Sequence, residues 1–347
     1  MKKFYSLEVK SIKRLTLDSV AITFNTLDYN FDFIPGQYIT IKQVIKNEEV
    51  RRSYSISSSP GNNIEIGVKL VNKGLMSTYL TKELKEGDVL EVMPPTGNFY
   101  LETNSKNSNH YVGICAGSGI TPILSMIRQT LAIEPESDFT LIYGNKKRDS
   151  VMFVKELQSL EQKFQSQFFV YYAFSRENVE GYINGRLNKE KLEAFFTENQ
   201  NIIKADKFFL CGPGELIDNT KTFLIDQDIK EDNIYFERFT SGEVPVQKST
   251  KKEIISHVTV SVDGDDFEFD LSSNGMSILD AAMEAGADVP FSCKGGVCCV
   301  CKAKVMEGEV EMDQNFSLSE DEVNQGFVLT CQSHPLTTNL VIDFDEI

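Results

Sequence analysis

The chain has 347 residues, with 51 acidic against 35 basic side chains and a formal net charge of −16. This length favours two or three domains, and the acidic balance argues against nucleic acid as a partner. No apolar run approaches the roughly 20 residues of a membrane span, and the N-terminus lacks the apolar region of a signal peptide. Seven cysteines in a chain this long do not indicate a disulfide framework, so we expect a cytoplasmic protein.

The first segment, residues 1–104, alternates short β-rich runs with turn residues. A brief helix is expected near residues 77–84. Many short strands with little helix predict a small antiparallel β-barrel. The expected strands cover residues 7–15, 19–24, 37–45, 51–58, 63–71 and 88–93.

Two short motifs in this segment indicate a flavin. On one expected strand, Arg52 can neutralise a phosphate, Tyr54 offers a flat ring and a hydroxyl, and Ser55 can hydrogen-bond the reactive edge of an isoalloxazine. Gly74 opens a helix whose free N–H groups form an anion site, to which Ser77 adds a hydroxyl. Short Arg/Tyr/Ser strands are common by themselves, but together the motifs predict a flavin pyrophosphate site. A pyrophosphate favours FAD, and FMN stays open.

In the second segment, residues 105–240, the spacing of apolar residues changes from a purely strand-like pattern. Strand-like and helix-like runs alternate, which predicts a parallel α/β sheet. Expected strands cover residues 110–117, 138–145, 168–175 and 207–213, and expected helices include residues 121–131 and 151–164. The segment is expected to end near residues 233–239.

A glycine-rich turn follows the first of these strands. Gly117 and Gly119 allow a tight turn and a close approach to a pyrophosphate, and Thr121 and Pro122 lead into the helix. Pro122 stands where the third glycine of a Rossmann fingerprint would be, so this is a different nucleotide loop.

Ser175 and Arg176, at a later strand end, bear on the choice of nucleotide. A hydroxyl beside a guanidinium suits an adenosine 2′-phosphate, whereas NAD sites favour an acidic residue on the ribose. This pair favours NADPH, although Glu177 follows directly and NADH stays possible. The alternative is an ordinary surface arginine.

Residues 241–255 are polar and charged, and we expect an interdomain linker. The third domain, residues 256–347, should open with a hairpin turned at Asp263–Gly264 and continue with a helix capped by Ser277. Residues 256–347 contain 18 acidic and 3 basic side chains, a net charge of −15, against −1 for the rest. This charge could serve solubility, but we favour an acidic face that docks a redox partner.

Four cysteines in this third domain show a C-x4-C-x2-C spacing with a distant fourth cysteine. The spacing matches a plant-type [2Fe–2S] centre, which carries one electron at low potential. Structural zinc is the alternative, but zinc sites usually pair two short knuckles. Cys299 lies off the pattern and is expected to be a spare. The expected ligands are Cys293, Cys298, Cys301 and Cys331.

The runs RSYSISSSP, LEVMPPTGNF and AGSGITPILSMI resemble the ferredoxin–NADP+ reductase superfamily, and the tail resembles an appended plant-type ferredoxin of β-grasp-like α+β fold. The resemblance implies that Ser55 lies near the hydride-accepting nitrogen of FAD, and that Cys211 and Gly212 lie by the nicotinamide. The alternative for Cys211 is a small buried apolar residue at a strand end. Phe239 resembles an aromatic residue near the flavin, with plain core packing as the alternative.

Within the superfamily, the same runs resemble reductase components of phenylacetyl-CoA ring-epoxidases, which are diiron oxygenases. The expected path is NADPH to FAD to [2Fe–2S] to such an oxygenase, because a flavin accepts a hydride and releases electrons singly. We expect no acid–base dyad, since the chemistry belongs to the cofactors. A Rieske-type oxygenase, a hydroxylase or a hybrid-cluster protein stays open as partner. The alternative to an enzyme is a non-catalytic adaptor protein that binds zinc.

Overall fold

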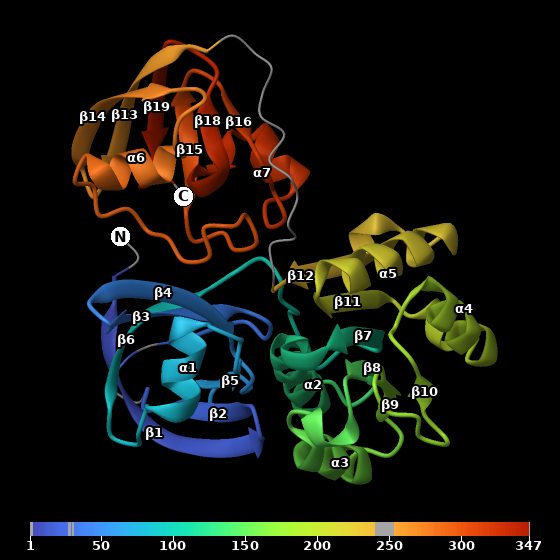
Figure 1. Cartoon of the computed structure of the whole chain (residues 1–347). Coiled ribbons are helices and arrows are strands. Elements are labelled where there is room, and N and C mark those ends of the chain that lie inside the picture. Colours follow the sequence, from blue (N-terminus) through green and yellow to red (C-terminus); the bar gives the residue numbers. More distant parts are fainter. Residues whose placement is uncertain (1–2, 27–28, 30, 240–252, 347) are drawn as a thin grey trace. The chain divides into compact units, whose positions relative to one another are not determined.

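The computed structural model of the chain describes residues 3–26, 29, 31–239 and 253–346 (Figure 1). It falls into two compact units: one holds most of an N-terminal barrel and an α/β domain, and the other holds the C-terminal domain together with Arg51–Ser53. In this described part, no helix is both long enough and apolar enough to cross a bilayer.

The N-terminal domain is an antiparallel barrel, as predicted. Its strands run in the order β4-β3-β6-β1-β2-β5, and a bridge between Ile56 and Ile66 joins the two ends of this order. Their apolar side chains alternate into one buried core, which includes Leu7, Ile22 and Ile41. The strand bounds are β1 Tyr5–Thr16, β2 Ser19–Phe24, β3 Tyr38–Ile45, β4 Glu48–Ser55, β5 Glu65–Lys69 and β6 Val89–Thr96.

Helix α1 (Leu75–Lys82) lies beside these strands in Figure 1. Met76 and Leu80, one turn apart, are buried in the barrel core and hold the helix there. The helix begins two residues before the expected residue 77, because Gly74 has an extended backbone that ends the preceding turn and opens the helix.

The second domain is a parallel sheet of order β10-β9-β8-β7-β11-β12. Helices cover both faces in Figure 1: α2 and α3 pack on one, α4 and α5 on the other. The bounds are β7 His110–Ala116, α2 Ile120–Ile133, β8 Asp138–Asn145, α3 Val154–Lys163, β9 Phe168–Phe174, β10 Ile183–Asn184, α4 Lys189–Glu198, β11 Lys207–Gly212, α5 Gly214–Asp226 and β12 Ile234–Arg238.

The helix expected over residues 151–164 begins only at Val154. Val151, Met152 and Phe153 are all buried in the core of this domain, ahead of the helix. Phe153 instead adopts a left-handed φ of 58° and turns the chain into α3.

The C-terminal domain has a mixed sheet of order β14-β13-β19-β15-β17 and a two-stranded ribbon of β16 and β18. Asp263 and Gly264 both have positive φ, so they form the expected hairpin turn, and the Ser277 hydroxyl caps α6. Most of the expected linker, residues 240–252, lies outside the described residues. The bounds are β13 Ile255–Val262, β14 Asp265–Ser272, α6 Ile278–Glu284, β15 Lys302–Glu307, β16 Val310–Met312, α7 Glu320–Asn324, β17 Phe327–Leu329, β18 Ser333–Pro335 and β19 Asn339–Asp343.

Candidate functional site

The expected flavin residues of β4 become more buried toward the end of the strand. Arg52 is exposed, Tyr54 is half-buried, and Ser55 at the strand end is buried. The strand therefore presents a cation toward solvent and places a hydroxyl inside the protein.

The start of α1 fits a phosphate group. Gly74 occupies the N-cap position of α1, and among the described residues no side chain forms a capping hydrogen bond there. The first turn of the helix carries no acidic residue. The Ser77 hydroxyl accepts a hydrogen bond from Val71 N at 3.1 Å and so holds the loop against the helix. A Cβ on Gly74 would lie 2.6 Å from Ser77 Oγ, so this close turn needs glycine. The first N–H groups of α1 can therefore receive an anion.

The glycine-rich turn and the end of β11 lie against each other. Gly117–Gly119 forms a 3₁₀ turn that leads into α2, whose first turn includes Thr121 and Pro122. A Cβ on Gly119 would lie 2.3 Å from the carbonyl oxygen of Cys211 and 3.1 Å from the nitrogen of Gly212. The structure thus brings together two motifs that are more than 90 residues apart in the sequence.

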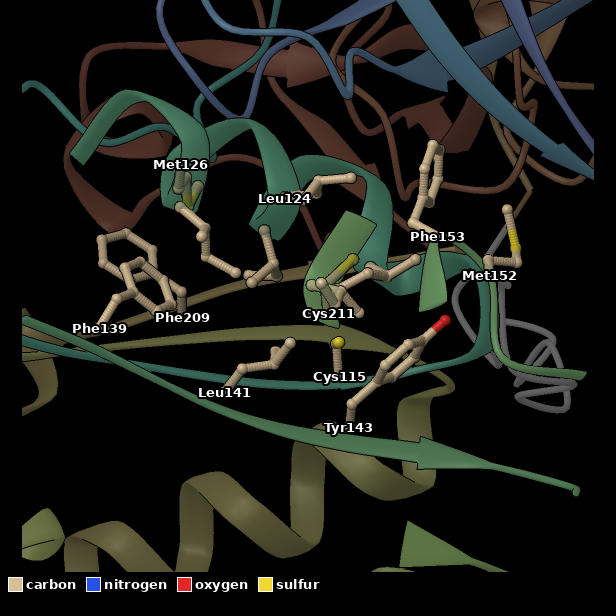
Figure 2. Close-up of a cluster of buried hydrophobic side chains, with 14 of the residues drawn as sticks. Cys115, Leu124, Met126, Phe139, Leu141, Tyr143, Met152, Phe153, Phe209 and Cys211 are labelled. Carbon is tan, nitrogen blue, oxygen red and sulfur yellow. The ribbon is translucent and has the colours of Figure 1, made fainter. Parts of the chain in front are cut away.

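Cys211 lies between two other polar residues in the sheet, Cys115 of β7 and Glu237 of β12. Figure 2 shows the sulfur atoms of Cys115 and Cys211 among the apolar side chains between the sheet and α2. Both thiols are fully buried, and burial raises the pKa of each well above its usual value. Cys211 is therefore a neutral thiol rather than a thiolate nucleophile.

Glu237 joins the barrel to the α/β domain at this point. The Ser55 hydroxyl donates to its carboxylate at 3.1 Å. Burial raises the pKa of Glu237 to about 8, although the hydrogen bond from Ser55 opposes the shift. Ser55 and Glu237 thus form a hydrogen-bonded pair between the two domains. The absence of an acid–base dyad from the hydride-transfer chemistry stays a prediction. In the sequence, the feature that points to Glu237 is its position as the one carboxylate in the aromatic-rich run YFERF.

Phe239 packs against the same buried cluster, and its backbone N–H lies 3.4 Å from the carbonyl oxygen of Gly212. This position is compatible with core packing and with a place near a flavin, so its role stays a prediction.

The expected nucleotide-selecting pair lies at the end of β9. Ser175 and Arg176 are exposed, and their backbone N–H groups bond the carbonyls of Asn145 and Lys146 at the end of β8. Glu177 accepts from the backbone and from the guanidinium of Arg148, at 2.8 and 2.9 Å. The Glu177 carboxylate, which could have favoured NADH, is therefore bound by Arg148.

The four cysteines of the tail form two pairs. The Cys298 thiol donates to Cys293 Sγ at 3.1 Å, which lowers the pKa of Cys293 to about 6 and raises that of Cys298. A hydrogen bond between Cys301 and Cys331 likewise lowers the pKa of Cys331 and raises that of Cys301. Two pairs suit two metal ions, each held by two sulfurs.

The backbone round these sulfurs supports the same fit. Gly295 N lies 3.4 Å from Cys293 Sγ, and Gly296 has a φ of 70° that favours glycine. Over the described ranges, no group of three or more Cys, His, Asp or Glu side chains is arranged to hold a single metal ion. Paired thiols with backbone N–H groups aimed at sulfur fit a [2Fe–2S] cluster better than zinc.

Comparison with known proteins assigns each domain. Residues 6–100 match the oxidoreductase FAD-binding domain, residues 114–222 the oxidoreductase NAD-binding domain, and residues 260–336 the 2Fe-2S iron-sulfur cluster binding domain. The chain is 41% identical over 352 residues to a component protein of the 1,2-phenylacetyl-CoA epoxidase of Escherichia coli, covering 99% of both chains.

It is also 29% identical to the ferredoxin reductase component of 3-ketosteroid-9-alpha-monooxygenase of Rhodococcus rhodochrous, covering 97% of this chain and 96% of the relative. Phthalate dioxygenase reductase has the same fold, with a TM-score of 0.62 at 24% identity over 98% of both chains. The chain therefore belongs to the family of FAD-, NAD- and [2Fe–2S]-binding reductases that includes this 1,2-phenylacetyl-CoA epoxidase component, and it is an NAD(P)H-dependent electron-transfer oxidoreductase.

Proposed function

We propose that this protein passes electrons from NADPH through FAD and a [2Fe–2S] cluster to the oxygenase component of a phenylacetyl-CoA epoxidase. The carrying observation is the meeting of Ser55, Glu237, Cys211 and Gly119 in one unit. They come from both expected cofactor domains. The bound flavin supplies the exchange between a two-electron hydride and single electrons.

The side chains and backbone of the protein bind the flavin and the nicotinamide dinucleotide and orient them toward each other. Arg52 and the start of α1 at Gly74 neutralise the pyrophosphate, and Tyr54 packs on the flavin. Gly117, Gly119, Thr121 and Pro122 receive the pyrophosphate of the dinucleotide. Cys211 and Gly212 form the wall against which the nicotinamide lies, and the neutral Cys211 thiol adds no charge there.

In the tail, Cys293 and Cys298 would hold one iron of the cluster, and Cys301 and Cys331 would hold the other. Burial of three of these thiols, with the fourth half-buried, keeps water from the sulfurs. The backbone N–H of Gly295 stabilises thiolate charge at Cys293.

The raised pKa of Glu237 predicts a pH profile. Glu237 is protonated at neutral pH, and above about pH 8 its half-buried negative charge beside Ser55 opposes the arrival of a hydride. We expect the rate constant of flavin reduction to fall about tenfold between pH 7 and pH 9. Glu237→Gln, which is neutral at every pH, should give a flat profile in stopped-flow measurements. The same inflection in both proteins would show that another group titrates.

NADPH is the proposed donor because the Arg176 guanidinium is exposed while Glu177 is turned to Arg148. Loss of a hydrogen bond to a charged group costs about 2 kcal/mol, so we expect Arg176→Ala to raise KM for NADPH about 30-fold. KM for NADH should stay within twofold. Lys189→Ala, which removes an exposed ion pair with Asp226 in the same domain, is the matched control. Equal losses with both nucleotides would contradict the assignment.

The partner is proposed from the relatives and from charge. The relatives are named as components of multicomponent oxygenases. The 18 acidic against 3 basic residues of the tail suit a basic docking face on the oxygenase. Iron–sulfur and nicotinamide chemistry suits a reducing compartment, so we place the protein in the cytoplasm.

The test is electron delivery to purified oxygenases. With NADPH, the protein should support turnover by a phenylacetyl-CoA epoxidase, and the rate should fall as ionic strength rises. The oxygenase component of a 3-ketosteroid-9-alpha-monooxygenase serves as the competing acceptor. Faster delivery to that acceptor would reject the proposed partner and leave the reductase chemistry in place.

A further inference from the structure

A polar cluster ties the barrel to the α/β domain away from the residues assigned above. The Ser125 hydroxyl of α2 donates to the Ser58 carbonyl at 2.6 Å. One turn further on, the Arg128 guanidinium donates to the Ser57 carbonyl. Ser57, Ser58 and Ser125 are all buried. We call Ser125, Arg128 and these two carbonyls the α2 clamp.

Arg128 also engages two carboxylates. Its Nη1 lies 3.0 Å from Glu65 Oε1 of β5, and its Nε lies 2.6 Å from Glu156 Oε1 of α3. The three side chains are 17%, 21% and 30% exposed, so water screens these contacts only partly. A planar guanidinium with five donors can satisfy a carbonyl and two carboxylates at once, whereas a lysine ammonium cannot match that geometry.

The clamp lies close in sequence to residues of both cofactor sites. Ser57 follows Ser55 by two residues, and Ile56 between them is fixed by its bridge to Ile66. On the other side, α2 begins at Ile120, directly after the turn of Gly117–Gly119. At 1.5 Å per residue, about 12 Å of rigid helix separates Ile120 from Arg128.

A second contact near the start of α2 fixes the direction of the helix. A Cβ on Gly67 of β5 would lie 2.5 Å from Thr121 Cγ2 and 3.0 Å from the ring of Phe153. The barrel strand therefore touches the first turn of α2, while the clamp grips the middle of the helix. Two contacts along one helix define both its distance from the barrel and its tilt.

We propose that Ser125 and Arg128 are positioning residues for hydride transfer, which set the spacing between Ser55 and the nucleotide turn by holding the Ser57 and Ser58 carbonyls. The inference rests on the proposed function. A hydride moves between groups in near contact, and a misplacement of 1 Å can cost about 100-fold in rate. A clamp that merely stabilised the fold would leave the rate of the correctly folded protein unchanged.

The experiment measures flavin reduction in the full-length holoprotein by stopped flow with saturating NADPH. Ser125→Ala removes one buried hydroxyl. Arg128→Lys keeps the positive charge but removes the planar guanidinium that can donate to several acceptors at once. Each should lower the limiting rate constant about tenfold while KM stays within twofold. The long-wavelength absorbance of the nicotinamide–flavin complex should weaken. The deuterium isotope effect with the deuterated nucleotide should rise toward its intrinsic value.

The matched control is Arg186→Lys, which changes an exposed arginine paired with Glu215 in the same domain and should leave the rate unchanged. FAD content, cluster absorbance and melting temperature are measured for each variant. An unchanged rate in both folded clamp variants would overturn the inference, as would a loss that merely follows FAD content. Failure of NADPH to reduce the unmodified protein would instead refute the proposed function.

Discussion

Cys331→Ser should abolish delivery of electrons to one-electron protein acceptors while leaving reduction of the flavin by NADPH intact. Cys331 arrives from a segment 30 residues beyond Cys301, with which it forms a pair in the structure. Removing one thiolate of a pair leaves an iron with a single cysteine ligand, so the cluster should not persist. We expect cytochrome c reduction to fall about 100-fold, because the electron path is cut.

The measurement combines the visible spectrum, iron and sulfide content, cytochrome c reduction and ferricyanide reduction. Ferricyanide takes electrons from the flavin directly, so its rate should stay within twofold. Cys299→Ser is the matched control, since Cys299 is also buried in the ligand loop but lies outside both pairs. A fully retained cluster in Cys331→Ser, or equal cluster loss in Cys299→Ser, would refute the ligand assignment.

Gly119→Ala should disable the nucleotide site. The new Cβ would lie 2.3 Å from Cys211 O and 2.7 Å from its carbonyl carbon, and backbone atoms cannot turn away as a flexible side chain can. The turn and the end of β11 must separate, at a cost of about 1–3 kcal/mol in unfolding free energy. Because the nicotinamide should lie against Cys211, we expect the rate constant of flavin reduction to fall about 100-fold.

The control for this prediction is Gly181→Ala in the same domain. There, φ is +81° and an added Cβ would meet no atom of the described chain within 4 Å, so only backbone strain is introduced. We expect a similar or smaller loss of melting temperature than for Gly119→Ala and normal flavin reduction. Normal flavin reduction in Gly119→Ala would show that the close contact with Cys211 does not shape the nucleotide site.

Much of the fold could be predicted because local rules decide it. The hairpin turn at Asp263–Gly264 and the cap at Ser277 lie where their chemistry requires them. The start of α3 differs from the prediction because Phe153 has a left-handed φ of 58°, which breaks the helix. Val151, Met152 and Phe153 pack in the domain core, and the contacts of that core are made between residues far apart in the sequence.

By itself, the sequence determined the three domain types and the cysteine spacing, because periodicity, turn residues and ligand intervals are local properties of a chain. The tertiary structure decided which distant groups meet. It placed Glu237 against Ser55 across 182 residues, set Gly119 against Cys211, and gave Arg128 its three partners on separate elements. The raised pKa of Glu237 follows from burial, which belongs to the packed protein and to no segment of it.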